Sequence, residues 1–194
     1  MLTEPLHPTE HRGYRELYAS LTQLSRHWQR LGARLAGSRV GAELVVGASE
    51  ASELLEALTE LTERRGPPGR PLAAGLGAAI AGARNVVGDR MLERNQAVRL
   101  ALLDVHHGRD LLGYLARAAE RRGDVEAAAF CRGARERLGT VKDDLRAAHV
   151  AMAGEPDLAI RPAEGSFAGR LASSAGVALG ALGELIDRRA GGRR

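Results

Sequence analysis

The chain has 194 residues, of which 44% are apolar and 27% charged, and its formal net charge is +4. These values are typical of one globular domain with an apolar core. Its one Trp, three Tyr and two Phe are too few for the stacking platforms of proteins that bind single-stranded nucleic acid. The single cysteine, Cys131, excludes an internal disulfide and a zinc finger. We therefore expect a protein of the reducing cytoplasm that has no nucleic-acid partner.

Neither an export signal nor a membrane span is predicted. The N-terminal residues lack the basic start and the apolar run of a signal peptide. The longest uncharged stretches, 71–83 and 171–183, are too short and too rich in Gly and Ala to cross a bilayer. A cytoplasmic location follows as the expectation.

Two amphipathic helices are predicted over residues 8–36 and 40–64. Apolar residues recur at steps of three and four in both, which is typical of bundle helices. In the first helix they are Tyr14, Leu17, Leu21, Leu24, Trp28, Leu31 and Leu35, and in the second Leu44, Gly47, Ala51, Leu54, Leu58 and Leu61. Gly37 suits the end of the first helix and Ser38 the N-cap of the second.

A Gly- and Pro-rich break separates these helices from two more. Residues 66–71, Gly-Pro-Pro-Gly-Arg-Pro, are incompatible with a helix. The small apolar residues that follow, 72–88, predict a short helix inside a long connection. Further amphipathic helices are predicted over 90–121 and 124–152, so the chain has four long helices.

The turn between the last two helices is tight, because Gly123 suits a helix C-terminus and Asp124 an N-cap. Four helices with tight first and last turns and one longer middle connection predict an all-α fold, an antiparallel four-helix bundle over residues 1–154. Residues 155–194 form a C-terminal helical extension.

This extension carries a weak apolar stripe and a basic end. We expect both to contact a partner surface, through Phe167, Leu171, Leu182, Leu185, Arg188, Arg189, Arg193 and Arg194. Burying a Leu contributes about 1.5–3 kcal/mol, whereas ordering each backbone residue costs about 1–2 kcal/mol. Because its large apolar residues are separated by Gly and Ser, the extension needs a surface on which to dock: its own bundle, a second copy or another protein.

The predicted helix over residues 90–121 places ionisable side chains on or beside its apolar face. The shared face, from the three- and four-residue steps, consists of Leu100, Leu103, His107, Leu111, Tyr114 and Ala118. His107 stands where a Leu is expected, and Asp110 lies one turn away. In an antiparallel bundle Glu50 is level with His107, so His107, Asp110 and Glu50 could hold a single divalent metal ion. The alternative is a buried neutral imidazole bonded to a carboxylate or a carbonyl, with His106 on the surface.

The Pro-rich break, the small-residue segment and the run His106-His107-Gly108-Arg109-Asp110 before Tyr114 resemble small bacterial ferritin-like four-helix-bundle proteins of the stress-associated or unknown-function type. The resemblance covers residues 10–150 and implies the fold. Ferritin-like di-metal sites need a Glu from each of two helices and Glu-x-x-His from each of the other two. No predicted helix contains Glu-x-x-His, so the resemblance does not extend to oxidase or iron-storage chemistry.

Three functions compete. A non-catalytic bundle that acts as an interaction or assembly protein, with a protein partner or with itself in a homo-oligomer, fits the apolar interior and the amphipathic extension, and we favour it. A ferritin-like metal protein with a degenerate site around His107 is the second. Attachment of the arginine-rich C-terminus to an anionic surface such as a membrane is the third. No catalytic residue is predicted, and no cofactor beyond that single metal ion.

Overall fold

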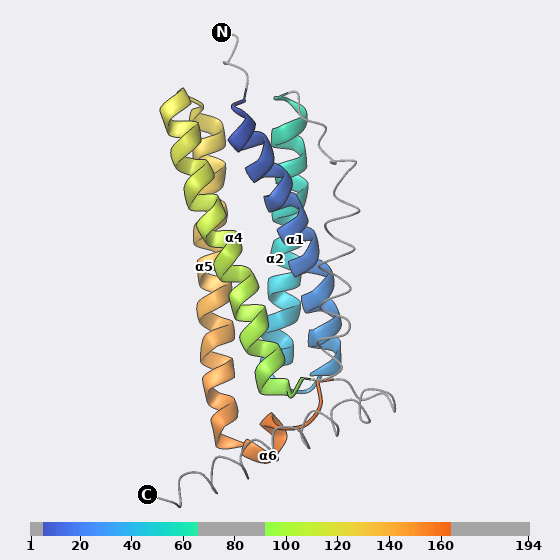
Figure 1. Cartoon of the computed structure of the whole chain (residues 1–194). Helices are drawn as coiled ribbons and strands as arrows, with labels where there is room; N and C mark the ends of the chain where they lie inside the picture. The colour runs from blue at the N-terminus through green and yellow to red at the C-terminus, as the bar shows by residue number, and fades with distance from the viewer. Residues whose placement is uncertain (1–5, 66–91, 164–194) are drawn as a thin grey trace, which may run out of the picture.

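The computed structural model describes residues 6–65 and 92–163. Its elements are α1 (Pro8–Arg34), α2 (Arg39–Glu63), α4 (Arg94–Arg122), α5 (Val125–Ala151), the 3-10 turn η1 (Met152–Gly154) and the short helix α6 (Pro156–Ala159) (Figure 1). Within the two described ranges β pairing is confined to one isolated bridge, between Glu93 and Pro162. The prediction of an all-α protein with four long helices is confirmed.

Capping residues fix both short turns where the sequence predicts them. Ser38 Oγ accepts a hydrogen bond from the Gly41 N–H (3.1 Å), and Asp124 Oδ1 accepts one from the Ala127 N–H (3.0 Å). Both side chains thereby satisfy a backbone donor that has no partner within its helix. Gly123, which ends α4, has a φ of +74°, a conformation that glycine adopts without steric strain.

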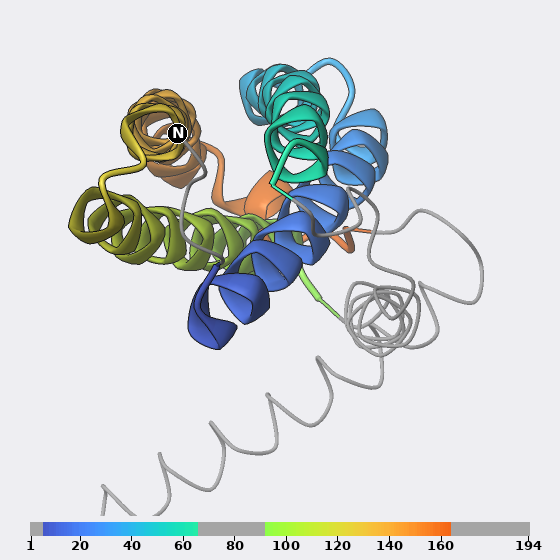
Figure 2. The ribbon, with the colours of Figure 1, turned by 90° about the horizontal axis from the view of Figure 1, so that it is seen from above.

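Contacts at the two ends of the molecule define how the helices run. At one end, Arg65 after α2 bonds Asp124 in the α4–α5 turn. At the other end, Leu35 after α1, Arg94 at the start of α4 and Met152 after α5 line one hollow. α2 and α4 therefore run in one direction and α1 and α5 in the other (Figure 1). Seen from above, α1 lies beside α2 and α4, and α5 contacts the same two helices (Figure 2).

An apolar core lies between the four long helices. Every predicted apolar position of α1 and α2 is buried. On α5 the buried residues include Ala127, Ala134, Leu138, Val141, Leu145 and Ala148, and Phe130 is partly buried. Trp28 is only 1% exposed. Its ring fits because Gly47 on α2 has no side chain: a Cβ at Gly47 would lie 2.3 Å from Cζ3 of the indole.

The predicted core face of α4 is wrong, because the helix is rotated about its axis relative to the prediction. Leu103 and Tyr114 are 61% and 51% exposed, and His107 is also exposed. The buried face consists instead of Ala97, Val98, Ala101, Val105, Gly108, Leu112, Leu115, Ala116 and Ala119. Small side chains on this face let α4 approach its neighbours closely. A Cβ at Gly108 would lie 3.5 Å from Ser20 Oγ on α1, which is an ordinary van der Waals contact.

The start of α4 also differs from the prediction, at Arg94 in place of residue 90. The preceding residues pair with the chain that follows α6. The Arg94 N–H donates to the Arg161 carbonyl (2.9 Å), and the Ala163 N–H donates to the Leu92 carbonyl (3.0 Å). These two hydrogen bonds hold the beginning of the C-terminal extension against the first turn of α4.

Two predictions fall on residues outside those described. They are the short helix over 72–88 and the extension beyond residue 163, which includes its apolar and arginine residues. Of the helices in the described part, none combines the length and the apolar character needed to cross a membrane.

Candidate functional site

The three predicted metal ligands each have a different partner. His107 Nε2 lies 3.0 Å from Glu16 Oε1 on α1. Asp110 Oδ2 lies 3.4 Å from His106 Nε2, one turn back along α4. Glu50 is bound by a guanidinium on α5. Among residues 6–65 and 92–163, no three His, Cys, Asp or Glu side chains form a group that could hold a metal ion.

The rotation of α4 and the pairing of Glu50 on α2 explain why these residues do not meet. The His107 side chain is 58% exposed, so its prediction as a buried imidazole is wrong, whereas His106 is exposed as predicted. Glu50 lies on α2 and faces α5, where Arg137 binds both Glu50 and Glu53. α2 and α4 each pack on α1 and α5; Glu50 pairs with Arg137 on α5, whereas His107 faces Glu16 on α1.

Most of the residues predicted to face the interior are exposed on one side of α4. We call Leu100, Leu103, His107, Leu111 and Tyr114 the α4 stripe. Leu100 is 42% exposed, and Leu103 and Tyr114 are more exposed still. Leu111 is partly buried against the core. Since all five recur at steps of three and four, they lie on one side of the helix, which gives α4 a second apolar face directed outward.

Glu16 on α1 borders this stripe. Its carboxylate, 54% exposed, faces the His107 imidazole across the seam between α1 and α4. Both groups are solvated, so the pair contributes little to folding stability. Its position at the middle of the stripe puts a polar contact between two apolar ends, Leu100 and Leu103 below and Tyr114 above.

Four buried ionised side chains form a second cluster at the end of the molecule where α2 and α4 end. We call Glu10, Arg65, Arg122 and Asp124 the ion cluster. Arg65 binds both oxygens of Asp124 at 2.7 Å, from Nε and from Nη2. Arg122 Nη2 lies 3.1 Å from Asp124 Oδ2 and 3.2 Å from Glu10 Oε1. The four side chains are at most 9% exposed, and each charge meets an opposite one, as burial of charge requires.

Pairing in the ion cluster changes the proton affinities of Asp124 and Arg65. The hydrogen bonds from Arg65 are the main cause that lowers the pKa of Asp124, from 3.8 to about 2, and the Ala127 N–H assists. The same pairing raises the pKa of Arg65. Both groups are therefore charged at neutral pH. Because the cluster joins the start of α1 and the end of α2 to the α4–α5 turn, its role is to hold these helix ends together.

Tyr14 and Cys131 lie next to the ion cluster in the core. Burial raises the pKa of the Cys131 thiol to about 12, and burial is also the main cause that raises the pKa of the Tyr14 hydroxyl. Cys131 is fully buried, so at neutral pH it is a protonated core residue. A thiolate nucleophile requires the opposite environment, exposed and electropositive.

Sequence reasoning missed Glu10, Arg65 and Arg122 as buried residues. Glu10 also completes a capping box, because its Oε2 accepts a hydrogen bond from the His7 N–H (3.1 Å). That role is visible in the spacing at the start of the helix. Nothing in the sequence indicates that Arg65 reaches Asp124, since that contact joins residues far apart in the chain.

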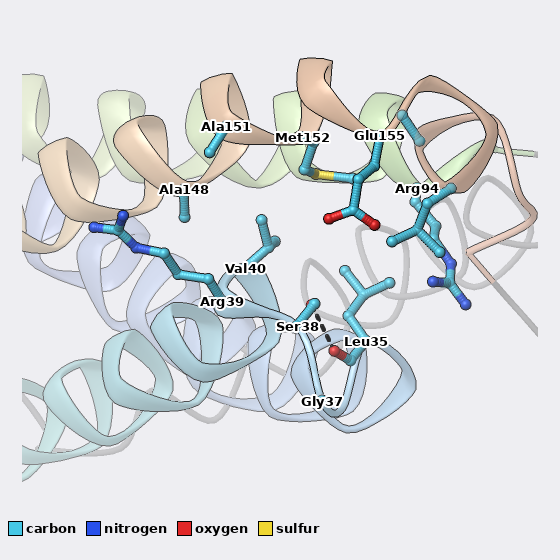
Figure 3. Close-up of a pocket in the computed structure, with 12 residues that line it drawn as sticks. Leu35, Gly37, Ser38, Arg39, Val40, Arg94, Ala148, Ala151, Met152 and Glu155 are labelled. Atoms are coloured by element: carbon cyan, nitrogen blue, oxygen red, sulfur yellow. Dashed lines mark hydrogen bonds between the residues drawn. The ribbon is translucent and has the colours of Figure 1, made fainter.

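A hollow of about 250 Å³ lies at the opposite end, below the α1–α2 turn. Apolar residues after α1 and in α2, α5, η1 and α6 form most of its wall: Leu35, Val40, Ala148, Ala151, Met152, Leu158 and Ala159. The Glu155 carboxylate is directed into this space, whereas the head of Arg39 extends away from it (Figure 3). Its volume is below the roughly 300–1,000 Å³ of typical small-molecule sites.

Comparisons of the chain with protein-family models, with curated proteins and with solved structures returned no match. The α4 stripe is therefore the candidate functional site on the strength of its own geometry, as a line of exposed apolar side chains on a well-packed helix.

Proposed function

We propose that this protein is a non-catalytic interaction protein in which an antiparallel four-helix bundle presents the α4 stripe to an amphipathic helix of a partner. The single observation that carries the proposal is the exposure of Leu100, Leu103 and Tyr114 along one side of α4. Scattered exposed apolar residues are ordinary on a protein surface, whereas contiguous apolar patches mark contact sites.

The spacing of the α4 stripe supports a helix as the occupant. Helices dock on apolar surfaces through side chains at steps of three, four and seven, and the stripe presents its apolar groups at those steps. Tyr114 combines a large apolar ring with a hydroxyl group, a property that makes tyrosine frequent among the residues that dominate interface energies. His107 and Glu16 supply a polar contact that orients the occupant.

The antiparallel bundle is supported by the two capped short turns and by the helix directions described above. A rigid body of this kind suits the role, because a contact surface on a well-packed helix loses little side-chain freedom on binding. The buried face of α4, from Ala97 to Ala119, lies apart from the exposed residues Leu100, Leu103 and Tyr114 of the α4 stripe.

The test replaces one exposed apolar residue with a charged one in the full chain. Leu103→Glu places a carboxylate in the α4 stripe, and Val46→Glu is the matched control, because Val46 on α2 is 59% exposed against 61% for Leu103. Substitutions at such exposed sites change stability by less than about 0.5 kcal/mol, and melting temperatures verify that both variants fold.

The readout is the mass of the protein in gently prepared extracts of the cells that make it, measured by size exclusion with light scattering. We expect the wild type and Val46→Glu to be present partly in an assembly heavier than one chain, and Leu103→Glu to shift to the mass of one chain. A wild type found only at the mass of one chain, or a Leu103→Glu variant that keeps the wild-type mass, overturns the proposal.

A further inference from the structure

Arginine side chains line the outer seam between α4 and α5. On α5, Arg135, Gly139, Lys142 and Arg146 recur at steps of four and three and therefore share one side of the helix. That side meets α4, because a Cβ at Gly139 would lie 3.3 Å from Arg109 Nη2. In the same way, a Cβ at Gly113 on α4 would lie 3.4 Å from Arg135 Nε. The two glycines thus leave room for two arginine side chains to lie across the seam.

Arg99 extends this row toward the start of α4. Burial is the main cause that lowers the pKa of His149 on α5, and the charge of Arg99 is the second, which places Arg99 beside the same seam. We call Arg99, Arg109, Arg135 and Arg146 the basic seam. It lies on the α5 side of α4, whereas the α4 stripe lies on the α1 side, where His107 meets Glu16.

The charges of the basic seam are not neutralised by the described part of the chain. Within residues 6–65 and 92–163, none of its four arginines takes part in an ion pair. Nearby carboxylates are directed to other cations: Glu120 binds Arg117 and Arg132, and Asp143 lies 4.0 Å from Lys142. Like charges held in one row repel each other, so the seam favours an acidic occupant.

The outer side of α2 carries the opposite charge. Glu53, Glu56, Glu60 and Glu63 are all exposed and recur at steps of three and four, so they lie along one side of the helix. We call these four residues the acidic face. Glu53 alone among them has an ion-pair partner in the two described ranges, Arg137. The acidic face is roughly 15 Å long, and Arg135 to Arg146 of the basic seam covers roughly 16 Å.

The basic seam and the acidic face cannot meet within one chain. α2 and α4 each pack on α1 and α5 and are therefore diagonal in the bundle. Seen from above, α4 and α5 form one side of the molecule, and α2 lies away from that side (Figure 2). The two surfaces match in length and are opposite in charge, so each can be satisfied by the other only between two molecules.

We propose that the basic seam binds the acidic face of a second copy of this chain, head to tail. Because different surfaces of the two copies meet, the contact leaves one free surface at each end, and further copies can add. The α4 stripe stays uncovered in such a row. If the proposed function holds, a row of chains presents several stripes at once and binds a multivalent partner with increased avidity; the head-to-tail contact itself does not depend on that function.

The mass of the purified full chain, measured by light scattering after size exclusion, tests the contact. Charge interactions reach about 30 Å at 0.01 M salt and about 3 Å at 1 M. At about 0.01 M salt we expect the mass of the wild type to rise above that of one chain as the protein concentration is raised. At about 1 M salt we expect the mass of one chain.

Two double variants separate this contact from a general effect of charge. Arg135→Glu with Arg146→Glu changes the basic seam and should give the mass of one chain at low salt. Arg26→Glu with Arg30→Glu is the matched control, because both residues are exposed on α1 and the change in net charge is the same. The control should associate as the wild type does, and circular dichroism verifies that both variants fold.

Mixing provides a second test. Glu56→Arg with Glu60→Arg changes the acidic face, and this variant alone should also stay at the mass of one chain. Mixed with the seam variant it should associate, since each variant retains the surface that the other lacks. A wild type that stays at the mass of one chain at low salt, equal losses in the seam variant and the control, or a mixture that does not associate overturns the proposal.

Other acidic occupants are separate outcomes. If the wild type stays at the mass of one chain while labelled poly-L-glutamate or a short DNA duplex binds it and not the seam variant, the proposal is overturned, and the seam belongs to an acidic protein or a nucleic acid. Leu103→Glu should leave the head-to-tail contact intact. In dilute extracts at about 0.15 M salt, charge interactions reach only about 8 Å, so the mass test of the proposed function there is read separately.

Discussion

A methyl group added at Gly47 should destabilise the protein, although the same change stabilises most helices. Replacing a mid-helix Gly by Ala ordinarily gains roughly 0.5–1 kcal/mol. At Gly47 the new Cβ would lie 2.3 and 2.5 Å from two atoms of the Trp28 ring and 2.8 Å from Val141 Cγ1. Trp28 is 1% exposed, and overpacking of this kind costs about 1–3 kcal/mol. The expected net loss for Gly47→Ala is about 1–2 kcal/mol.

Gly133 on α5 provides the matched control, because a Cβ there meets no atom within 4 Å. Gly133→Ala should therefore gain roughly 0.5–1 kcal/mol. Urea unfolding followed by circular dichroism gives both free energies of unfolding, and the two melting temperatures should move in opposite directions, by about 2–4 °C per kcal/mol for a chain of this size.

A double variant tests whether the Trp28 ring is the cause. In a Trp28→Phe background the outer part of the indole is gone, so Gly47→Ala should cost less than in the wild type. Equal stability of Gly47→Ala and Gly133→Ala, or an unchanged cost in the Trp28→Phe background, would refute the described packing of α1 against α2.

Three further predictions concern the core and the ion cluster. Trp28→Ala should lower the free energy of unfolding in urea by about 3–5 kcal/mol. The native protein should show the blue-shifted emission of a buried indole, and emission typical of exposed tryptophan would contradict the placement of α1. The pKa of Asp124 is lowered from 3.8 to about 2, mainly by Arg65. Its contribution to the free energy of unfolding, roughly 2 kcal/mol, is therefore complete above about pH 4 and is lost as the pH falls from there to about 2. Asp124→Asn should remove this part of the acid dependence of unfolding, and an unchanged profile would show that the ion cluster is not coupled to folding. Because burial raises the pKa of Cys131 to about 12, its thiol should react with maleimide at pH 8 only after unfolding, and rapid labelling of the native chain would place Cys131 on the surface.

The sequence was sufficient to predict which face of α1 is buried, because that helix has a single apolar stripe. Polar residues occupy most of its other positions, so only one rotation buries Leu17, Leu24 and Trp28. The caps were equally predictable, since Ser38 and Asp124 act through hydrogen bonds to residues three positions away. Local chemistry therefore predicts the helix boundaries and the turns.

For α4 the sequence contains two apolar stripes and no local criterion to choose between them. The prediction favoured the stripe with the larger side chains, Leu103 and Tyr114, whereas the structure buries the one with Ala101, Val105 and Gly108. The choice depends on how closely α1 and α5 approach, which is a property of the whole core. The residues of the α4 stripe were thus wrongly assigned to the interior.

The ion cluster was beyond sequence reasoning for a related reason. Arg65 follows a helix that ends in polar residues, a position typical of a solvated side chain. It is buried because α2 ends beside the α4–α5 turn. Charged residues that pair over such distances in the chain become recognisable only when the helix directions are known.

The most direct measurement is site-specific photocrosslinking from position 103 in the full chain inside the cells that make it, with position 46 as the control. A photoreactive phenylalanine analogue replaces Leu103 or Val46, and mass spectrometry identifies what each one captures. We predict that position 103 captures a helix of one defined partner, with little capture at position 46. Capture at position 103 that is no greater or more specific than at position 46 would contradict the assignment of the α4 stripe as a contact surface.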